Sequence, residues 1–209
     1  MSLESALRAG LEALDTPCDE AQQTRLLDYL GLIERWNRTY NLTAVREPAE
    51  MLSKHLLDSL SVLPWVAPGQ LLDAGTGAGL PGIPLAVASP EREFTLLDSS
   101  SKKLRFVQQT LAIITLDNVT LENRRIEDYQ PEERFDTIIC RAFSDLQELH
   151  RHASKLIAPD GRILAMKGVY PMTEIECLED KDVVDEVIPL KVPGMDAQRH
   201  LVCMHAAAQ

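Results

Sequence analysis

Three glycines at alternate positions follow an apolar run that ends in an acid, in the stretch Leu71-Leu72-Asp73-Ala74-Gly75-Thr76-Gly77-Ala78-Gly79. Pro81 and Pro84 come next, and proline suits the first turn of a helix, where its missing N–H would have no partner. The pattern predicts a strand, a tight glycine turn and a helix N-terminus. Such a junction leaves backbone bare and N–H groups unpaired, so it can bind a negative or polar ligand.

A carboxylate ends the next apolar run, Phe94-Thr95-Leu96-Leu97-Asp98. In nucleotide-binding α/β sheets an acid about 20 residues beyond the glycine turn accepts hydrogen bonds from ribose hydroxyls. Asp98 could instead cap the helix expected from Lys102, but the serines at 99–101 can cap that helix equally well. The ribose role is therefore the favoured interpretation.

The spacing of the glycines separates two classes of nucleotide cofactor. The dinucleotide fingerprint G-x-G-x-x-G needs a glycine at position 80, where this chain has Leu80, with Gly79 one place earlier. The pattern G-x-G-x-G resembles the turn after the first strand of S-adenosylmethionine-dependent methyltransferases. A nicotinamide-dependent oxidoreductase would share the turn and Asp98, so it stays an alternative from another class.

From residue 70 onward, short apolar runs alternate with helical patterns. Strands are expected at 71–74, 94–98, 119–122, 135–141, 162–167, 183–190 and 200–205, and helices at 82–88, 102–116, 146–157 and 171–178. Only a Pro193-Gly194 loop separates the last two strands, so no helix fits there and the two strands should be antiparallel. The expected fold class is α/β, the Rossmann-like sheet of class I S-adenosylmethionine methyltransferases with an antiparallel last strand and a helical N-terminal extension.

The N-terminal part is predicted to be a helical extension, residues 1–66, before a methyltransferase domain, residues 67–209. Prolines and a glycine near residue 66 indicate this boundary. Trp36 and Tyr40 lie on the apolar stripe of the first long helical pattern and are interpreted as core rather than as base-stacking surfaces. A later helix, from Pro48 to residue 63, is expected to carry three polar residues on one face: Lys54, His55 and Asp58.

The composition restricts the partners. The 209-residue chain has a net charge of −11, which argues against indiscriminate nucleic-acid binding but not against a local basic face. The acidic stretch 174–186 is interpreted as solvated surface. The four cysteines form no C-x-x-C pair and indicate reduced, mostly buried thiols. With no long apolar stretch and no signal-peptide pattern, a cytoplasmic location without a membrane partner is expected.

Several motifs together resemble one family over essentially the whole chain. They are Asn41–Arg46, Lys54–Ser59, Asp73–Pro84, Leu96–Ser99, Arg141–Phe143, Met166–Gly168 and Arg199–Leu201. In these stretches the chain is similar to the bacterial ribosomal RNA small subunit methyltransferase G family, also called glucose-inhibited division protein B. The resemblance implies transfer of a methyl group from S-adenosyl-L-methionine to N7 of one guanine in 16S ribosomal RNA. Its expected partner is 16S rRNA within the small ribosomal subunit or an assembly intermediate, with no DNA expected.

The resemblance also implies cofactor contacts at Gly75, Leu80, Ile126, Glu127 and Arg141. Together with the glycine turn and the ribose acid, the expected cofactor site is Gly75, Gly77, Gly79, Leu80, Asp98, Ile126, Glu127 and Arg141. Basic residues around the carboxyl ends of the strands favour a phosphate-bearing substrate over a small molecule. The expected RNA contacts are Lys54, His55, Arg125, Lys167 and Arg199. A methyltransferase with another substrate and a non-catalytic ribosome assembly factor stay open as alternatives.

The absence of two motifs limits which atom of a base the enzyme could methylate. Methylation of an exocyclic base amine commonly uses an Asn/Asp-Pro-Pro-aromatic motif after the fourth strand, where this chain has Cys140-Arg141-Ala142-Phe143. Methylation of cytosine C5 needs a cysteine nucleophile, but the chain's Pro17-Cys18 is N-terminal and Cys140 is expected to be a core thiol. Guanine N7 has a lone pair and no proton to lose, so it needs alignment rather than a general base. No catalytic base and no metal are expected.

Overall fold

The computed structural model describes residues 2–143 and 145–206, and its centre is a seven-stranded sheet with the order β3-β2-β1-β4-β5-β7-β6. Its strands are β1 (Gln70–Ala74), β2 (Glu93–Leu97), β3 (Val119–Glu122), β4 (Phe135–Arg141), β5 (Ile157–Lys167), β6 (Val184–Pro189) and β7 (His200–Met204). Neighbours pair in parallel from β3 to β5, whereas β7 is antiparallel to both β5 and β6. The predicted α/β sheet with an antiparallel last strand is confirmed.

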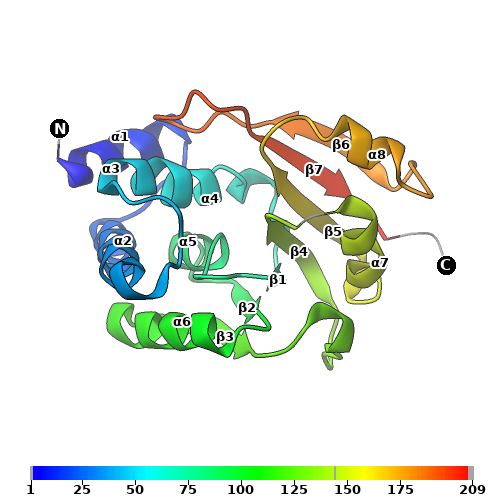
Figure 1. Ribbon diagram of the computed structural model, residues 1–209, viewed down its shortest axis with the longest axis horizontal. Helices are drawn as coiled ribbons and strands as arrows, with labels where there is room; N and C mark the ends of the chain where they lie inside the picture. Colours follow the sequence, from blue (N-terminus) through cyan, green and yellow to red (C-terminus); the bar gives the residue numbers. More distant parts are fainter. Residues whose placement is uncertain (1, 144, 207–209) are drawn as a thin grey trace.

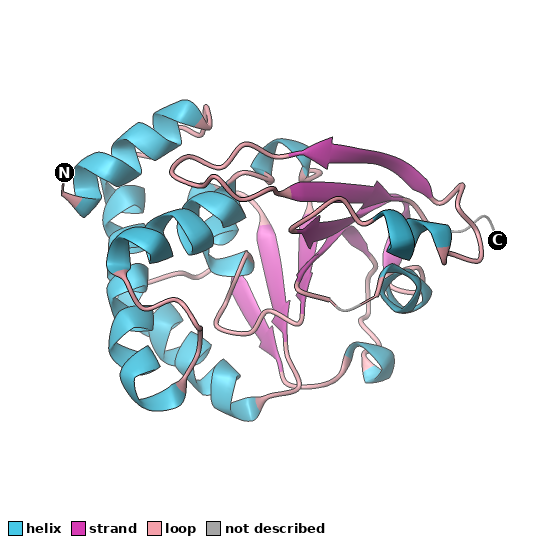
Figure 2. Ribbon diagram, turned by 45° about the horizontal axis from the view of Figure 1, so that its top comes forward, coloured by secondary structure: helices cyan, strands magenta, loops and turns pink. Residues whose placement is uncertain are grey.

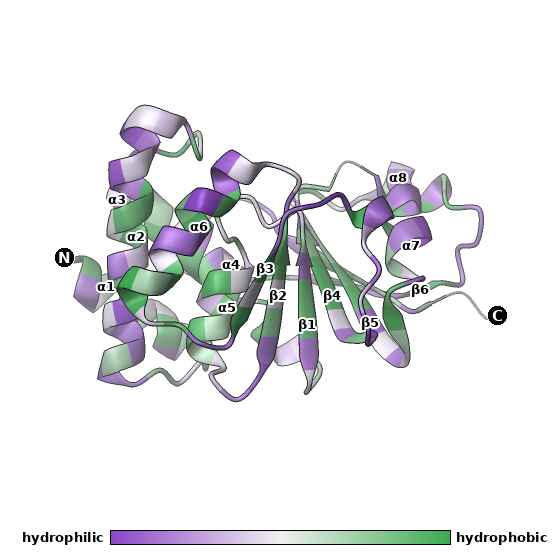
Figure 3. Cartoon of the chain, turned by 90° about the horizontal axis from the view of Figure 1, so that it is seen from below, coloured by the Kyte–Doolittle hydropathy of each residue, from purple (hydrophilic) through white to green (hydrophobic). Residues whose placement is uncertain are grey.

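Helices cover both faces of this sheet (Figures 1 and 2). They are α1 (Leu3–Ala13), α2 (Glu20–Tyr40), α3 (Pro48–Met51), α4 (Asp58–Leu60), α5 (Gly82–Ala88), α6 (Ser101–Ile114), α7 (Leu146–Ala153) and α8 (Met172–Glu176), with shorter segments η1 (Leu52–Leu57), η2 (Leu63–Trp65) and η3 (Ile126–Asp128). Figure 3 shows α1–α6 on one side of the strands and α7 and α8 on the other. None of the helices within residues 2–143 and 145–206 combines the length and apolar character needed to cross a membrane.

Successive strand residues point to opposite faces of the sheet and so enter different cores. In β1, Leu71 packs into the core formed with the N-terminal helices, α5 and α6, whereas Leu72 packs into the core formed with α7. Leu26 and Ile33 of α2 belong to the first of these cores. The N-terminal helices therefore share a core with the sheet, and the division of the chain at residue 66 stays a prediction.

Two expectations about local structure are wrong. The helix expected over 146–157 ends at Ala153, and Ile157 already begins β5, where it pairs with Phe135. The apolar residues near 157 fit a helical period but are buried in the sheet. Tyr40, expected in the core, is 40% exposed on the last turn of α2, stacked on Trp36 with their ring centroids 4.8 Å apart.

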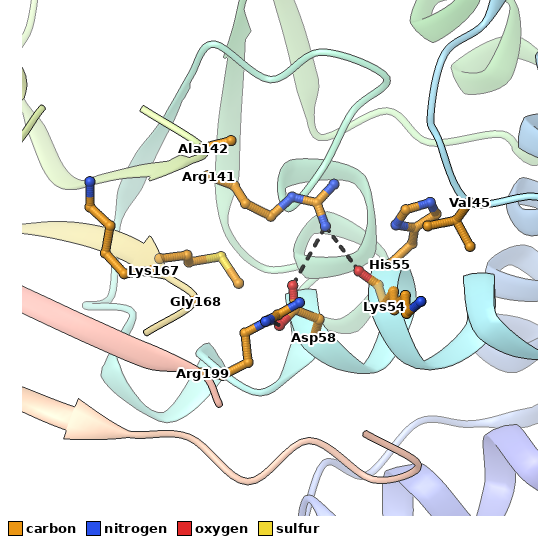
Figure 4. A pocket seen from close by; sticks show the side chains of 10 residues that line it. Val45, Lys54, His55, Asp58, Arg141, Ala142, Lys167, Gly168 and Arg199 are labelled. Atoms are coloured by element: carbon orange, nitrogen blue, oxygen red, sulfur yellow. Dashed lines mark hydrogen bonds and ion pairs between the residues drawn. The ribbon is translucent and has the colours of Figure 1, made fainter. Parts of the chain in front are cut away.

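The helix expected from Pro48 contains a π-helical segment, η1, that the sequence pattern did not predict. It lies between α3 and α4 and carries Lys54 and His55, with Asp58 at the start of α4. Such wide turns are rare and occur frequently at functional sites. All three polar residues face one cavity (Figure 4), as their shared helix face predicted.

Candidate active site

The glycine turn after β1 leaves its backbone open. Gly75 and Gly77 have positive φ angles of 75° and 63°, which favour glycine. A Cβ on Gly75 would meet no atom within 4 Å, so a ligand can approach this backbone closely. Gly79 differs, because a Cβ there would clash with Ile83 and lie 3.3 Å from the Tyr29 hydroxyl. The first two glycines therefore open the surface and the third permits packing.

Asp73, near the end of β1, holds the glycine turn through hydrogen bonds of its side chain. Its Oδ2 accepts hydrogen bonds from the Thr76 hydroxyl at 2.6 Å and from the backbone N–H of Gly82 at 2.8 Å. The side chain is fully buried, and among the described residues its Oδ1 has no partner. Burial raises the pKa of Asp73 to about 6, and the two hydrogen bonds lower it by less. This carboxyl thus ties the turn to the start of α5.

The raised pKa of Asp73 predicts a pH-dependent stability. Because the folded protein binds this proton more tightly than the unfolded chain, the contribution of Asp73 is full below its ordinary pKa of 3.8 and is lost as pH rises through about 6. We expect the unfolding free energy of the protein, relative to Asp73→Asn, to fall by about 2.4 kcal/mol between pH 4 and 7. Urea unfolding of both proteins across this range measures the difference. A difference that grows with pH would contradict the raised pKa.

Asp98 follows β2 and contacts the glycine turn directly. Its Oδ2 accepts the backbone N–H of Gly77 and its Oδ1 that of Ser100, both at 2.8 Å. Ser100 also caps α6 by accepting the N–H of Lys103, so a serine provides the cap, as the sequence allowed. Each carboxylate oxygen of Asp98 keeps a further lone pair for a ligand.

A cavity of about 320 Å³, here the glycine-turn cavity, lies beside these groups. It brings together four residues expected at the cofactor: Gly75, Asp98, Ile126 and Glu127. Arg125, expected at the RNA, also lines this cavity, and Phe143 adds an aromatic wall that the sequence did not predict. Bare backbone, a carboxylate and apolar walls fit a nucleoside with hydroxyl groups. Gly77 acts through its hydrogen bond to Asp98, while Leu80 is buried in the core.

A second cavity, of about 380 Å³, is here the basic cavity (Figure 4). Four residues expected at the RNA line it: Lys54, His55, Lys167 and Arg199. Arg141, expected at the cofactor, also lies here rather than in the glycine-turn cavity. The segment after β4 separates the two spaces, since Ala142 lines the basic cavity and Phe143 the other.

Asp58 joins two arginines in the basic cavity. Its Oδ1 accepts a hydrogen bond from Arg199 Nε at 2.9 Å, and its Oδ2 lies 3.6 Å from Arg141 Nη1. The same Arg141 nitrogen donates to the carbonyl oxygen of Lys54 at 3.1 Å. Asp58 is buried, and burial raises its pKa by more than the two arginines lower it. A helix carboxylate thus fixes two guanidinium groups, one from the last residue of β4 and one from the residue that precedes β7.

His55 is buried in the wall of the basic cavity and is uncharged at neutral pH. Burial, with the nearby Arg141, lowers the pKa of His55 to about 4. Its Nε2 lies 3.0 Å from the Thr43 hydroxyl oxygen. His55 therefore offers a phosphate no positive charge at neutral pH.

The ammonium group of Lys167 is held by hydrogen bonds to other residues of the protein. Its Nζ donates to the carbonyl oxygen of Phe143 at 3.0 Å and to Glu174 Oε2 at 2.6 Å, and its side chain is 10% exposed. Glu174 also accepts the first N–H of α7, from Leu146. The sequence interpretation of 174–186 as solvated surface missed this role of Glu174. Lys167 and Glu174 together hold the segment that separates the two cavities, where Ala142 has a strained φ of 63°.

Comparisons with known proteins agree with this geometry. The family model for GidB, described as rRNA small subunit methyltransferase G, matches residues 22–202. Ribosomal RNA small subunit methyltransferase G of Laribacter hongkongensis is 48% identical to this chain, over 97% of this chain and 98% of its own length. The protein of the same name from Chromobacterium violaceum is also 48% identical, over 98% of this chain and 99% of its own length. A SAM-dependent methyltransferase structure from Aquifex aeolicus is similar with a TM-score of 0.60, covering 77% of this chain and 94% of that chain at 17% identity, and shares the fold.

Proposed function

Because this chain belongs to the rRNA small subunit methyltransferase G family, we propose that its glycine-turn cavity holds S-adenosyl-L-methionine and its basic cavity a guanine of 16S rRNA. The protein is an S-adenosyl-L-methionine-dependent methyltransferase whose acceptor is N7 of a guanine in 16S ribosomal RNA. Two adjoining cavities, one suited to a nucleoside and one lined by cations, are the observation that carries the assignment of the sites. Family membership excludes the oxidoreductase alternative.

The residues of the glycine-turn cavity suit the cofactor. When bound, S-adenosyl-L-methionine supplies a methyl group on a positively charged sulfur. Gly75 offers bare backbone, and Asp98 can accept hydrogen bonds from the ribose hydroxyls. Ile126 and Glu127 provide an apolar contact and a polar edge for the adenine, while Arg141 lines the basic cavity.

The basic cavity suits positioning of the acceptor base. Guanine N7 carries no proton, so the chain needs to align this atom and need not remove a proton. Positive charge develops on the guanine ring during transfer, and an unpaired cation beside N7 would oppose it. Asp58 offsets one of the two positive charges of Arg141 and Arg199, so both arginines can contact a phosphate or the guanine O6 acceptor with a smaller local positive charge than two unpaired cations would give.

The pairing of basic with acidic residues at the two cavities also affects whether free RNA or RNA within a ribosomal particle is the better substrate. Each expected basic contact has an acidic partner: Lys54 with Glu50, Arg125 with Glu127, Lys167 with Glu174 and Arg199 with Asp58. Each pair lowers the net positive charge at the two cavities, and neutralisation of phosphates by cations is the main source of affinity for free RNA. We propose that the substrate is the RNA within the small subunit or an assembly intermediate, and that the protein works in the cytoplasm.

We expect unmethylated small subunits to be methylated at least about tenfold faster than protein-free 16S RNA at the same concentration, because weak phosphate contacts make affinity depend on a preformed site. Transfer of radiolabel from the cofactor to RNA, measured at two salt concentrations, tests this. Already methylated subunits are the control and should accept no label. Equal rates on subunits and free RNA would contradict the need for presentation, and label on neither would contradict the proposed function.

A further inference from the structure

An exposed apolar loop follows β5 at the edge of the basic cavity. Among the described residues, five large hydrophobic side chains are exposed, and three of them lie in the segment 169–172, which comprises this loop and the first residue of α8. Val169 is 72% exposed, Tyr170 46% and Met172 56%. Scattered single exposures are ordinary, but a contiguous apolar group on the surface usually marks a contact site.

One hydrogen bond and one aromatic contact join the loop to β7, and a second hydrogen bond lies within the segment. The His200 Nδ1–H donates to the carbonyl oxygen of Gly168 at 2.9 Å, and the Tyr170 ring meets the His200 ring edge to face with centroids 5.5 Å apart. The N–H of Met172 donates to the Tyr170 carbonyl at 3.0 Å. Gly168 and Arg199 line the cavity itself (Figure 4), so Tyr170 and His200 continue its rim outward.

The other exposed large side chains lack this setting. Tyr40 is stacked on Trp36, and the Lys102 Nζ lies 5.0 Å from its ring centroid. Ile113 is a single exposed residue on α6. Tyr170 alone among the five exposed side chains of the described residues joins an open aromatic ring to a rim that carries an arginine. An aromatic ring beside cations is the chemistry that binds unstacked bases of single-stranded RNA.

We propose that the loop from Val169 to Met172 is a stacking platform for the nucleotide next to the target guanine, with its base on the ring of Tyr170. The proposal rests on the function proposed above and assigns a specificity contact to that site. Cations at the cavity hold the phosphate backbone, and the loop takes a neighbouring base. Val169 and Met172 lie near Tyr170 in the chain and add exposed apolar surface to the platform.

Substitutions of Tyr170 test the stacking on unmethylated small subunits. Tyr170→Ala and Tyr170→Leu should each raise KM for subunits about tenfold, because both lose the ring. Tyr170→Phe should stay within about twofold of the parent. The slope of log affinity against log salt should not change, because no phosphate contact is lost. Cofactor affinity should also stay unchanged, and Ile113→Ala is the matched control for loss of an exposed apolar side chain.

A photo-cross-linking residue, p-benzoylphenylalanine, in place of Tyr170 identifies the occupant. The proposal predicts a cross-link to 16S RNA within about two nucleotides of the methylated guanine, the reach of one stacked neighbour. A cross-link to a ribosomal protein, or a parent-like KM for Tyr170→Leu, would overturn the platform while leaving the methyltransferase function intact. Failure of the parent enzyme to label subunits would instead contradict the proposed function.

Discussion

Asp58→Asn is expected to lower kcat/KM for small subunits about 100-fold. A displacement of about 1 Å in a positioning group causes a loss of this size. Asp58 holds Arg199 through Oδ1 and faces Arg141 through Oδ2. An asparagine keeps the volume and can accept from one arginine, but its NH₂ group would face the other donor. One guanidinium group would then leave its place in the basic cavity.

The fold should survive this change. Breaking a fully buried ion pair costs about 3–5 kcal/mol, but the side chains of Arg141 and Arg199 are each 24% exposed and can be hydrated. Burial also raises the pKa of Asp58, so removing its charge relieves a desolvation cost. We therefore expect the unfolding free energy to fall by less than about 3 kcal/mol. Steady-state kinetics and urea unfolding of the same preparation separate the two effects.

Glu50→Gln is the matched control, because it removes the acid partner of Lys54 at an exposed i,i+4 pair, which contributes little to stability. Its kcat/KM should stay within a few-fold of the parent. Parent-like kinetics for Asp58→Asn would contradict a positioning role. If the activity of Asp58→Asn fell only in proportion to the fraction of unfolded protein, Asp58 would have a structural role alone.

The second large effect is expected at the cofactor. Asp98→Ala should raise the Kd for S-adenosyl-L-methionine about 10- to 150-fold, which corresponds to about 1.5–3 kcal/mol for hydrogen bonds to a charged group. The carboxylate lies in the glycine-turn cavity and also holds the N–H groups of Gly77 and Ser100. Calorimetric titration gives the affinity, and the thermal transition reports any change of fold.

Ser100→Ala separates the ribose contact from support of the local backbone, because it removes the cap of α6 and leaves the carboxylate in place. It should lower stability by about 1 kcal/mol with little change in cofactor Kd. If Ser100→Ala weakened the cofactor as much as Asp98→Ala, disturbance of the start of α6 would account for the loss in Asp98→Ala without a ribose contact. An unchanged Kd in Asp98→Ala would rule out the ribose role.

Local signals in the sequence were sufficient to predict most of the sheet. The strand at 119–122 and the helix at 82–88 have the predicted bounds. The half-exposed edge strand alternates apolar and polar residues, and proline and glycine mark the start of the helix. The short loop at Pro193-Gly194 correctly predicted the antiparallel last strand. The π-helical segment could not be predicted, since its apolar residues fit an ordinary helix equally well and tertiary packing decides between them.

The sequence predicted which residues lie at the candidate site, but it did not predict the hydrogen bonds and ion pairs that join them. Residues at the ends of strands meet by topology, which is why Gly75 and Asp98 were placed correctly together. The partners of the basic residues are long-range contacts: Arg199 reaches Asp58 across 141 positions of the chain. No local pattern indicates such a pair, and the same holds for Glu174, which belongs to an acidic stretch typical of solvated surface.

Identification of the methylated atom is the most direct test that the protein transfers the methyl group to guanine N7. Small subunits lacking the modification are incubated with the enzyme and cofactor labelled in the methyl group, and their 16S RNA is digested to nucleosides and separated with mass detection. We expect the label to be found in 7-methylguanosine, because the acceptor has a lone pair and no proton to lose. Label in an exocyclic amine or a ribose hydroxyl, each of which must lose a proton to a base, would contradict it.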